Sequence, residues 1–174
     1  NTTASNNTAV GYQAGYSNTT GTDTTAIGSG ALYSASTAVS NTAVGKNALN
    51  ATTGSYNTGV GHGSLALNTT GADNTALGFY SLLVNTSGAY NTAIGREALQ
   101  ANTTASFNTA VGYQASYANT TGYVNTSVGN VAGANNTTGA ENTYLGYAAG
   151  QYNTSSSYNT AVGNQALQAN LASY

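Results

Sequence analysis

The sequence predicts an all-β protein, a parallel β-solenoid (β-roll) of ten 17-residue turns. The main evidence for this fold is a five-residue motif that recurs along the whole chain. In its most regular form the motif is Asn-Thr-Ala-Val-Gly. The copies follow one another at a 17-residue spacing, except for one 16-residue step from Asn41 to Asn57. A fixed short period is typical of solenoids and fibres. The ten copies begin at Asn7, Thr24, Asn41, Asn57, Asn74, Asn91, Asn108, Asn125, Asn142 and Asn159.

The motif itself predicts a short strand. Counted from its first residue, position 2 is always Thr, position 4 is Val, Ile or Leu, and position 5 is always Gly. β-branched residues at alternating positions, followed by Gly, indicate a strand that ends at a bend. Alternation places Thr and the aliphatic residue on one face and positions 1, 3 and 5 on the other.

We predict that the aliphatic face of these strands lines the core. The predicted core residues are Val10, Ile27, Val44, Val60, Leu77, Ile94, Val111, Val128, Leu145 and Val162. The predicted strand-ending glycines are Gly11, Gly28, Gly45, Gly61, Gly78, Gly95, Gly112, Gly129, Gly146 and Gly163.

The remainder of each turn predicts a second extended segment. Position 8 is Ala or Ser, and position 9 is Leu in six copies, which indicates another inward-facing point. Asn-Thr-Thr-Gly follows in many copies, as at 68–71, and combines turn formers with a short extended stretch. We therefore expect two short strands per turn, joined by two bends. A helix around residues 96–100 is disfavoured because each period contains a Gly. A glycine inside a helix lowers helix stability by about 1 kcal/mol relative to alanine.

Charged residues are scarce and confined to a few columns. They form 3% of the chain, which has a net charge of −2, and Lys46 and Arg96 are its only Lys and Arg residues. Two cations cannot form the basic surface of a nucleic-acid-binding protein, so no nucleic-acid partner is expected. The longest aliphatic run, 82–84, is far too short for membrane insertion. Charges and many aromatic residues share positions 6 and 17, which we expect to be exposed.

The repeats predict one continuous array over residues 1–174. Residues 1–4, Asn-Thr-Thr-Ala, match 18–21 one period later, so we expect an excerpt of a longer fibre. Two aliphatic side chains per turn form a thin core, and thin solenoids commonly pack against other copies. The small residues at positions 1, 3 and 5 predict that this face packs against sister chains. Self-association, as a homotrimer or filament, is therefore expected.

The Asn-Thr-Ala-Val-Gly and Asn-Thr-Ala-Ile-Gly units resemble the YadA-like head repeats of trimeric autotransporter adhesins, and similar Asn-Thr-rich repeats occur in phage tail-fibre-like proteins. The resemblance covers nearly the whole chain. It implies a left-handed β-roll, three chains side by side, and a role in surface attachment. The repeat is longer here than the usual head repeat, and the Asn-Thr-Thr-Gly insert is not part of that pattern.

Several columns are candidate modification or binding sites. Asn-x-Ser/Thr triplets at position 12 predict a line of N-glycans, although Asn and Thr are also ordinary turn and ladder residues that form such triplets by chance. The Thr columns are candidates for ice binding, and the exposed Tyr columns for a carbohydrate or host-surface ligand, or for a seam between chains. The candidate glycosylation sites are Asn1, Asn18, Asn68, Asn85, Asn102, Asn119, Asn136 and Asn153.

Catalysis is not expected, and the chain is not predicted to be an enzyme. His62 is the only histidine, and nothing in the sequence places it with Asp73 and a serine. The repeats lack an acidic residue at a fixed position in every turn, which a repeated metal site would need. We therefore expect no bound metal and no cofactor. The favoured hypothesis is a structural segment of an extracellular fibre, adhesin or viral tail fibre, located outside the cell, on its surface or on a virion. The alternatives are an N-glycan-coated extracellular filament and an ice- or carbohydrate-binding β-solenoid.

Overall fold

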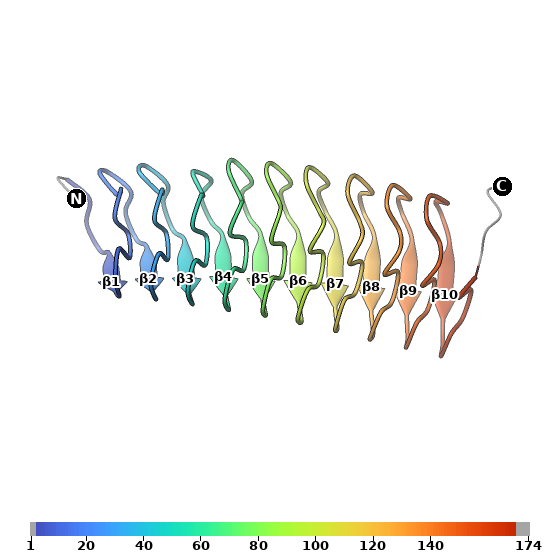
Figure 1. Ribbon diagram of the computed structural model, residues 1–174. Helices are drawn as coiled ribbons and strands as arrows, with labels where there is room; N and C mark the ends of the chain where they lie inside the picture. The colour runs from blue at the N-terminus through green and yellow to red at the C-terminus, as the bar shows by residue number, and fades with distance from the viewer. Residues whose placement is uncertain (1–2, 170–174) are drawn as a thin grey trace.

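A computed structural model, which describes residues 3–169, confirms the all-β parallel solenoid. One sheet of ten parallel strands runs the length of the molecule in the sequential order β1 to β10, and nine turns separate the strands (Figure 1). Each strand has three residues, and no helix occurs among the described residues. The strands are β1 (Thr8–Val10), β2 (Thr25–Ile27), β3 (Thr42–Val44), β4 (Thr58–Val60), β5 (Thr75–Leu77), β6 (Thr92–Ile94), β7 (Thr109–Val111), β8 (Thr126–Val128), β9 (Thr143–Leu145) and β10 (Thr160–Val162).

Equivalent residues stack directly on one another. Thr92 pairs with Thr109, and Ile94 pairs with Val111. The shorter step between the third and fourth copies does not disturb this register, because Thr42 still pairs with Thr58. The missing residue lies in the Thr-Thr corner, where the backbone N–H groups of Thr53 and Gly54 both donate to the Thr69 carbonyl. A corner without strand pairing therefore absorbs the deletion.

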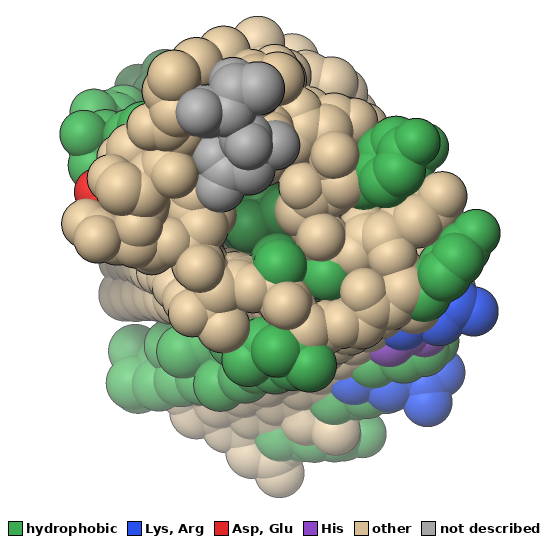
Figure 2. Space-filling view, turned by 90° about the vertical axis from the view of Figure 1, so that its left-hand side faces the viewer, with side chains coloured by type: hydrophobic (Ala, Val, Ile, Leu, Met, Phe, Trp, Pro, Cys, Tyr) green, Lys and Arg blue, Asp and Glu red, His purple; other side chains and the backbone are tan. Residues whose placement is uncertain are grey.

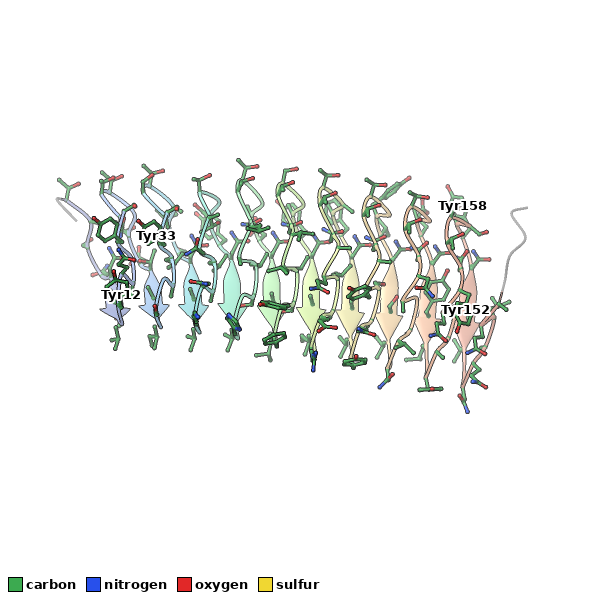
Figure 3. The ribbon with its side chains drawn as sticks, viewed as in Figure 1. Tyr12, Tyr33, Tyr152 and Tyr158 are labelled. Atoms are coloured by element: carbon green, nitrogen blue, oxygen red, sulfur yellow. The ribbon has the colours of Figure 1, made fainter. Side chains whose placement is uncertain are left out.

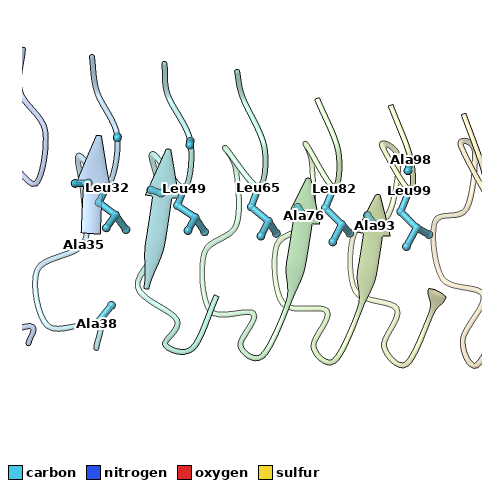
Figure 4. Packing of buried hydrophobic residues seen from close by; sticks show 14 of the residues in the cluster. Leu32, Ala35, Ala38, Leu49, Leu65, Ala76, Leu82, Ala93, Ala98 and Leu99 are labelled. Atoms are coloured by element: carbon cyan, nitrogen blue, oxygen red, sulfur yellow. The ribbon is translucent and has the colours of Figure 1, made fainter. Parts of the chain in front are cut away.

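The prediction that the aliphatic residues of position 4 fill the core is wrong. These side chains point outward, as Val10 and Val162 show with exposed fractions of 58% and 63%. Ile27, Leu77 and Leu145 are also exposed, and Val44, Val60, Ile94, Val111 and Val128 are half-buried. The core instead consists of positions 3, 8 and 9, as in Ala93, Ala98 and Leu99 (Figure 4).

Available space explains this inversion. A Cβ added to Gly59 at position 3 would lie 3.2 Å from Cγ of Leu49, so the inner face of the strand packs directly against the position-9 side chain. Only a methyl group fits there in most turns, and a Val or Ile would be too large. The small face is therefore the inner face of its own chain. The prediction that this face packs against sister chains is wrong for the same reason.

The second predicted strand does not form in the described residues. The Asn-Thr-Thr-Gly segments are bends, although their residues still form hydrogen bonds to the next turn of the solenoid. The backbone N–H of Thr69 donates to the Thr86 carbonyl at 3.0 Å, and its hydroxyl donates to the same oxygen at 2.8 Å. Such a turn thus has one strand and a corner in which a threonine hydroxyl bonds to the next turn.

Left-handed backbone conformations recur at fixed positions and let each turn of the coil close. The position-5 glycines directly follow the strands and have φ between +125° and +142°. The position-9 leucines also have positive φ, such as +50° for Leu99. This conformation costs a non-glycine residue about 1–2 kcal/mol. Full burial of a Leu side chain contributes about 1.5–3 kcal/mol and offsets it.

Candidate functional surface

The predicted line of N-glycans is wrong for the position-12 asparagines that the structure describes. Asn18, Asn68, Asn85, Asn102, Asn119, Asn136 and Asn153 are all buried, with exposed fractions of 8% or less. Their amides lie inside the solenoid, where a glycan has no room. Asn1 lies outside the described residues.

These buried asparagines form one of two internal ladders. Nδ2 of Asn102 donates to Oδ1 of Asn85 in the preceding turn at 2.9 Å and to the Ala105 carbonyl at 3.1 Å. Nδ2 of Asn91, at position 1, donates to the same Ala105 carbonyl at 2.9 Å. Two asparagines in one turn therefore hold one carbonyl, and this satisfies polar groups that would otherwise be costly to bury.

The outward strand face is built from two parallel columns, position 2 and position 4. Thr75 and Leu77 of β5 are both exposed, while Ala76 between them is fully buried. Because pairing is parallel and in register, each column places equivalent side chains about 4.8 Å apart along the rod. The result is a regular array of hydroxyl, methyl and aliphatic groups, which we call the strand face.

A column of residues two positions after each strand borders this face, and we call it the post-strand column. It contains every Lys, Arg and His of the chain, interleaved with aromatic residues. The Arg96 guanidinium carbon lies 5.4 Å from the centre of the Phe79 ring and 6.0 Å from that of Tyr113. The members are Tyr12, Ser29, Lys46, His62, Phe79, Arg96, Tyr113, Asn130, Tyr147 and Asn164.

A second column, two positions before each strand, borders the opposite end of the strand face, and we call it the pre-strand column. Three of the four acidic residues lie in it. The rings of Tyr90 and Phe107 stack in neighbouring turns, 5.0 Å apart and 5° from parallel. Tyr158 belongs to this column and Tyr12 to the post-strand column (Figure 3). The members are Asn6, Asp23, Ser40, Tyr56, Asp73, Tyr90, Phe107, Val124, Glu141 and Tyr158.

Two carboxylates are held ionised by hydrogen bonds. Asn6 and Thr22 lower the pKa of Asp23, and Nδ2 of Asn6 donates to Oδ1 of Asp23 at 2.9 Å. Glu97 accepts a hydrogen bond from Nε2 of Gln114 at 2.8 Å, which is the main reason that its pKa is lowered. Glu97 also pairs with Nε of Arg96 at 3.0 Å.

The structure does not bring His62 and Asp73 together. His62 follows β4, whereas Asp73 precedes β5, so they lie at opposite ends of neighbouring strands. The His62 ring instead lies 5.3 Å from that of Phe79 and 5.2 Å from that of Tyr80. Within residues 3–169, no three metal-ligating side chains gather at one place. No helix in this range is long and apolar enough to span a membrane.

Some features of this surface cannot be found by inspecting single repeats. Exposure of position 4, stacking between neighbouring turns and the placement of Arg96 between two rings all depend on the register of the coil. An alignment of the repeats, position by position, would reveal the stacking between neighbouring turns and the placement of Arg96 between two rings.

The chain is thus a parallel β-solenoid with asparagine ladders inside and the strand face outside. Comparison with protein-family models, curated proteins and solved structures gives no match.

Proposed function

We propose that this chain is a structural segment of an extracellular fibre, adhesin or viral tail fibre that mediates surface attachment and associates with further copies of itself. The observation that supports this most is the unbroken in-register pairing of all ten strands, each braced by ladders that run from turn to turn. At about 4.8 Å per turn, the nine turns span roughly 43 Å, so added repeats add length without changing the cross-section.

Repetition also supports an attachment role. Each exposed column presents similar groups at regular spacing, and many weak contacts along one rod combine into strong attachment. The resemblance to adhesin heads and tail fibres is consistent with this role. We propose that the protein is located outside the cell, on the cell surface or on a virion.

Location tests the proposal directly. Antibodies raised against residues 3–169 should label projections on intact cells or particles of the source in immunogold electron microscopy. Labelling that requires lysis of the cells, with none on projecting structures, would refute the fibre role. Antibodies against an internal protein of the same source serve as the integrity control.

A second candidate function is binding of ice or of a carbohydrate, and the strand face is the observation that favours it. Thr92 and Ile94 both point outward with the buried Ala93 between them, so threonine and aliphatic columns form a regular two-dimensional lattice. Exposed rings such as Tyr90 and Phe107 offer stacking surfaces for a sugar.

Thermal hysteresis tests the ice candidate. The wild-type protein should depress the freezing point below the melting point, and Thr92→Tyr should reduce this effect by interrupting the regular threonine column. Thr104→Tyr is a matched control, because Thr104 is exposed at the opposite corner. No hysteresis at high protein concentration would exclude ice, and binding to a glycan array would then test the carbohydrate candidate.

A further inference from the structure

The charges of this chain are segregated across the strand face. Lys46, Arg96 and His62 all lie in the post-strand column, and Asp23, Asp73 and Glu141 all lie in the pre-strand column. Only Glu97, next to Arg96, departs from this division. Seen along the rod, the basic side chains gather at the lower right, and an acidic side chain lies on the opposite side (Figure 2). Each rod therefore has one basic and one acidic edge.

We propose that the partner of this surface is a second copy of the same chain, parallel to the first and shifted by one turn, with the post-strand column of one copy against the pre-strand column of the next. The inference rests on the proposed fibre role and names its partner.

The one-turn shift is chosen by the order of residues in the two columns. When each post-strand residue meets the pre-strand residue that belongs to the preceding strand, Lys46 lies opposite Asp23 and Arg96 opposite Asp73. The same shift matches the large apolar residues. The pairs so formed are Phe79 with Tyr56, Tyr113 with Tyr90, and Tyr147 with Val124.

The neighbouring registers are poorer. With no shift, Lys46 meets Ser40, Arg96 meets Tyr90, and no ion pair forms. With a one-turn shift in the opposite direction, Lys46 meets Tyr56 and Arg96 meets Phe107, so neither of these two cations faces an acidic residue. Complementary charges favour the one-turn shift, because of the three registers compared only this one places Lys46 and Arg96 opposite acidic residues.

The charged groups are already oriented for such a contact. The guanidinium of Arg96 lies between the Phe79 and Tyr113 rings, while its side chain remains 60% exposed. The Asp23 carboxylate is exposed and is held by Asn6. Groups fixed before contact lose less conformational entropy on binding.

This contact is heterologous, because one edge of a copy meets the other edge of its neighbour. A cyclic trimer requires no axial shift between subunits, whereas a repeated one-turn shift displaces every successive copy along the rod. Such an interface does not close and grows as an open assembly. We therefore expect a staggered ribbon in place of the closed homotrimer.

Charge reversal with mixing tests the proposal. We expect the mass of the wild-type particle in light scattering to rise with protein concentration and to fall in about 1 M salt, where charges are screened within about 3 Å. The double variant K46E/R96E has two acidic edges, and D23K/D73K has two basic edges. Each alone should remain monomeric, and an equimolar mixture should regain concentration-dependent growth.

Pairwise reversal tests the register. K46D should weaken association, and adding D23K to it should restore the wild-type behaviour, because these two positions face one another. Adding D73K instead should weaken association further, because that lysine faces Arg96. All four positions are exposed, so equal denaturation midpoints should show that the variants fold alike.

A mixture that stays monomeric, a wild-type monomer at all concentrations, or a closed trimer of constant mass would each overturn the proposal. So would rescue of K46D by D73K rather than by D23K. None of these outcomes affects the immunogold result, so the fibre role and the ribbon register fail separately.

Discussion

The ring of Tyr144 occupies the space that Gly150 leaves open in the core. Position 9 is Leu in most inner turns but Ser116, Gly133 and Gly150 in three successive turns. Tyr144 stands at position 3, where other turns have Ala, Gly or Ser, and it is 1% exposed. A Cβ on Gly133 would lie 2.7 Å from Cδ2 of the ring, and one on Gly150 would overlap the ring carbons. A large and a small residue have exchanged places within the core.

This exchange predicts a loss and a rescue of stability. Tyr144→Ala should lower the free energy of unfolding by about 3–5 kcal/mol, since it opens a cavity over two glycines. Gly150→Leu should also destabilise, because its side chain meets the ring. The double variant should recover much of the loss, since Gly150 already has the φ of +60° that a position-9 Leu needs. Denaturant unfolding of all four proteins checks this, and additive effects would contradict the exchange.

Tyr144 also predicts alkaline sensitivity. Burial raises the pKa of Tyr144 above its ordinary value of 10.0, and its hydroxyl accepts a hydrogen bond from Nδ2 of Asn153. Above pH 10 the unfolded chain loses this proton while the folded chain retains it. The stability conferred by the buried neutral ring is therefore present below pH 10 and lost as the pH rises through the raised folded pKa. Unfolding measured between pH 8 and 11 should show a steeper loss for wild type than for Tyr144→Phe; parallel losses would contradict the prediction.

The position-5 glycines predict a matched comparison. A Cβ on Gly95 would lie 2.7 Å from the carbonyl carbon of Gly112 in the next turn, and φ is +130°. Gly163 has a similar φ of +125°, but the nearest atom to its added Cβ would be Cβ of Ala166 at 4.0 Å. Gly95→Ala should therefore destabilise markedly more than Gly163→Ala, which bears only the backbone cost. Thermal unfolding of both variants checks this, and equal losses would show that stacking contributes nothing.

The sequence predicted the architecture well and the polarity of the strand badly. The period, the strand at Thr92–Ile94 and the bend at Gly95 follow from local patterns, and all three are present. Alternation also separated Thr92 and Ile94 correctly from Ala93. The more hydrophobic face of the strand was then wrongly assigned to the core. The space inside the solenoid depends on the whole turn, so the three residues of the strand do not determine which face fits there. Burial of the position-12 asparagines was also not predicted, because it depends on partners that the fold supplies, such as Asn85 and the Ala105 carbonyl for Asn102.

The ladder of position-1 asparagines predicts a local loss of protection. Nδ2 of Asn91 donates to the Ala105 carbonyl at 2.9 Å, and its Oδ1 accepts the backbone N–H of Asn108 at 3.0 Å. Asn91→Leu is close in size but leaves the buried N–H of Asn108 without its partner, at about 1–3 kcal/mol, whereas the Ala105 carbonyl keeps its hydrogen bond from Asn102. We expect lower stability and faster hydrogen exchange at the Asn108 amide. Asn130→Leu, at an exposed position, is the control and should change neither. Unchanged exchange at Asn108 in the Asn91 variant would mean that this amide is protected by the coil itself and that the ladder is not needed to hold the turns together.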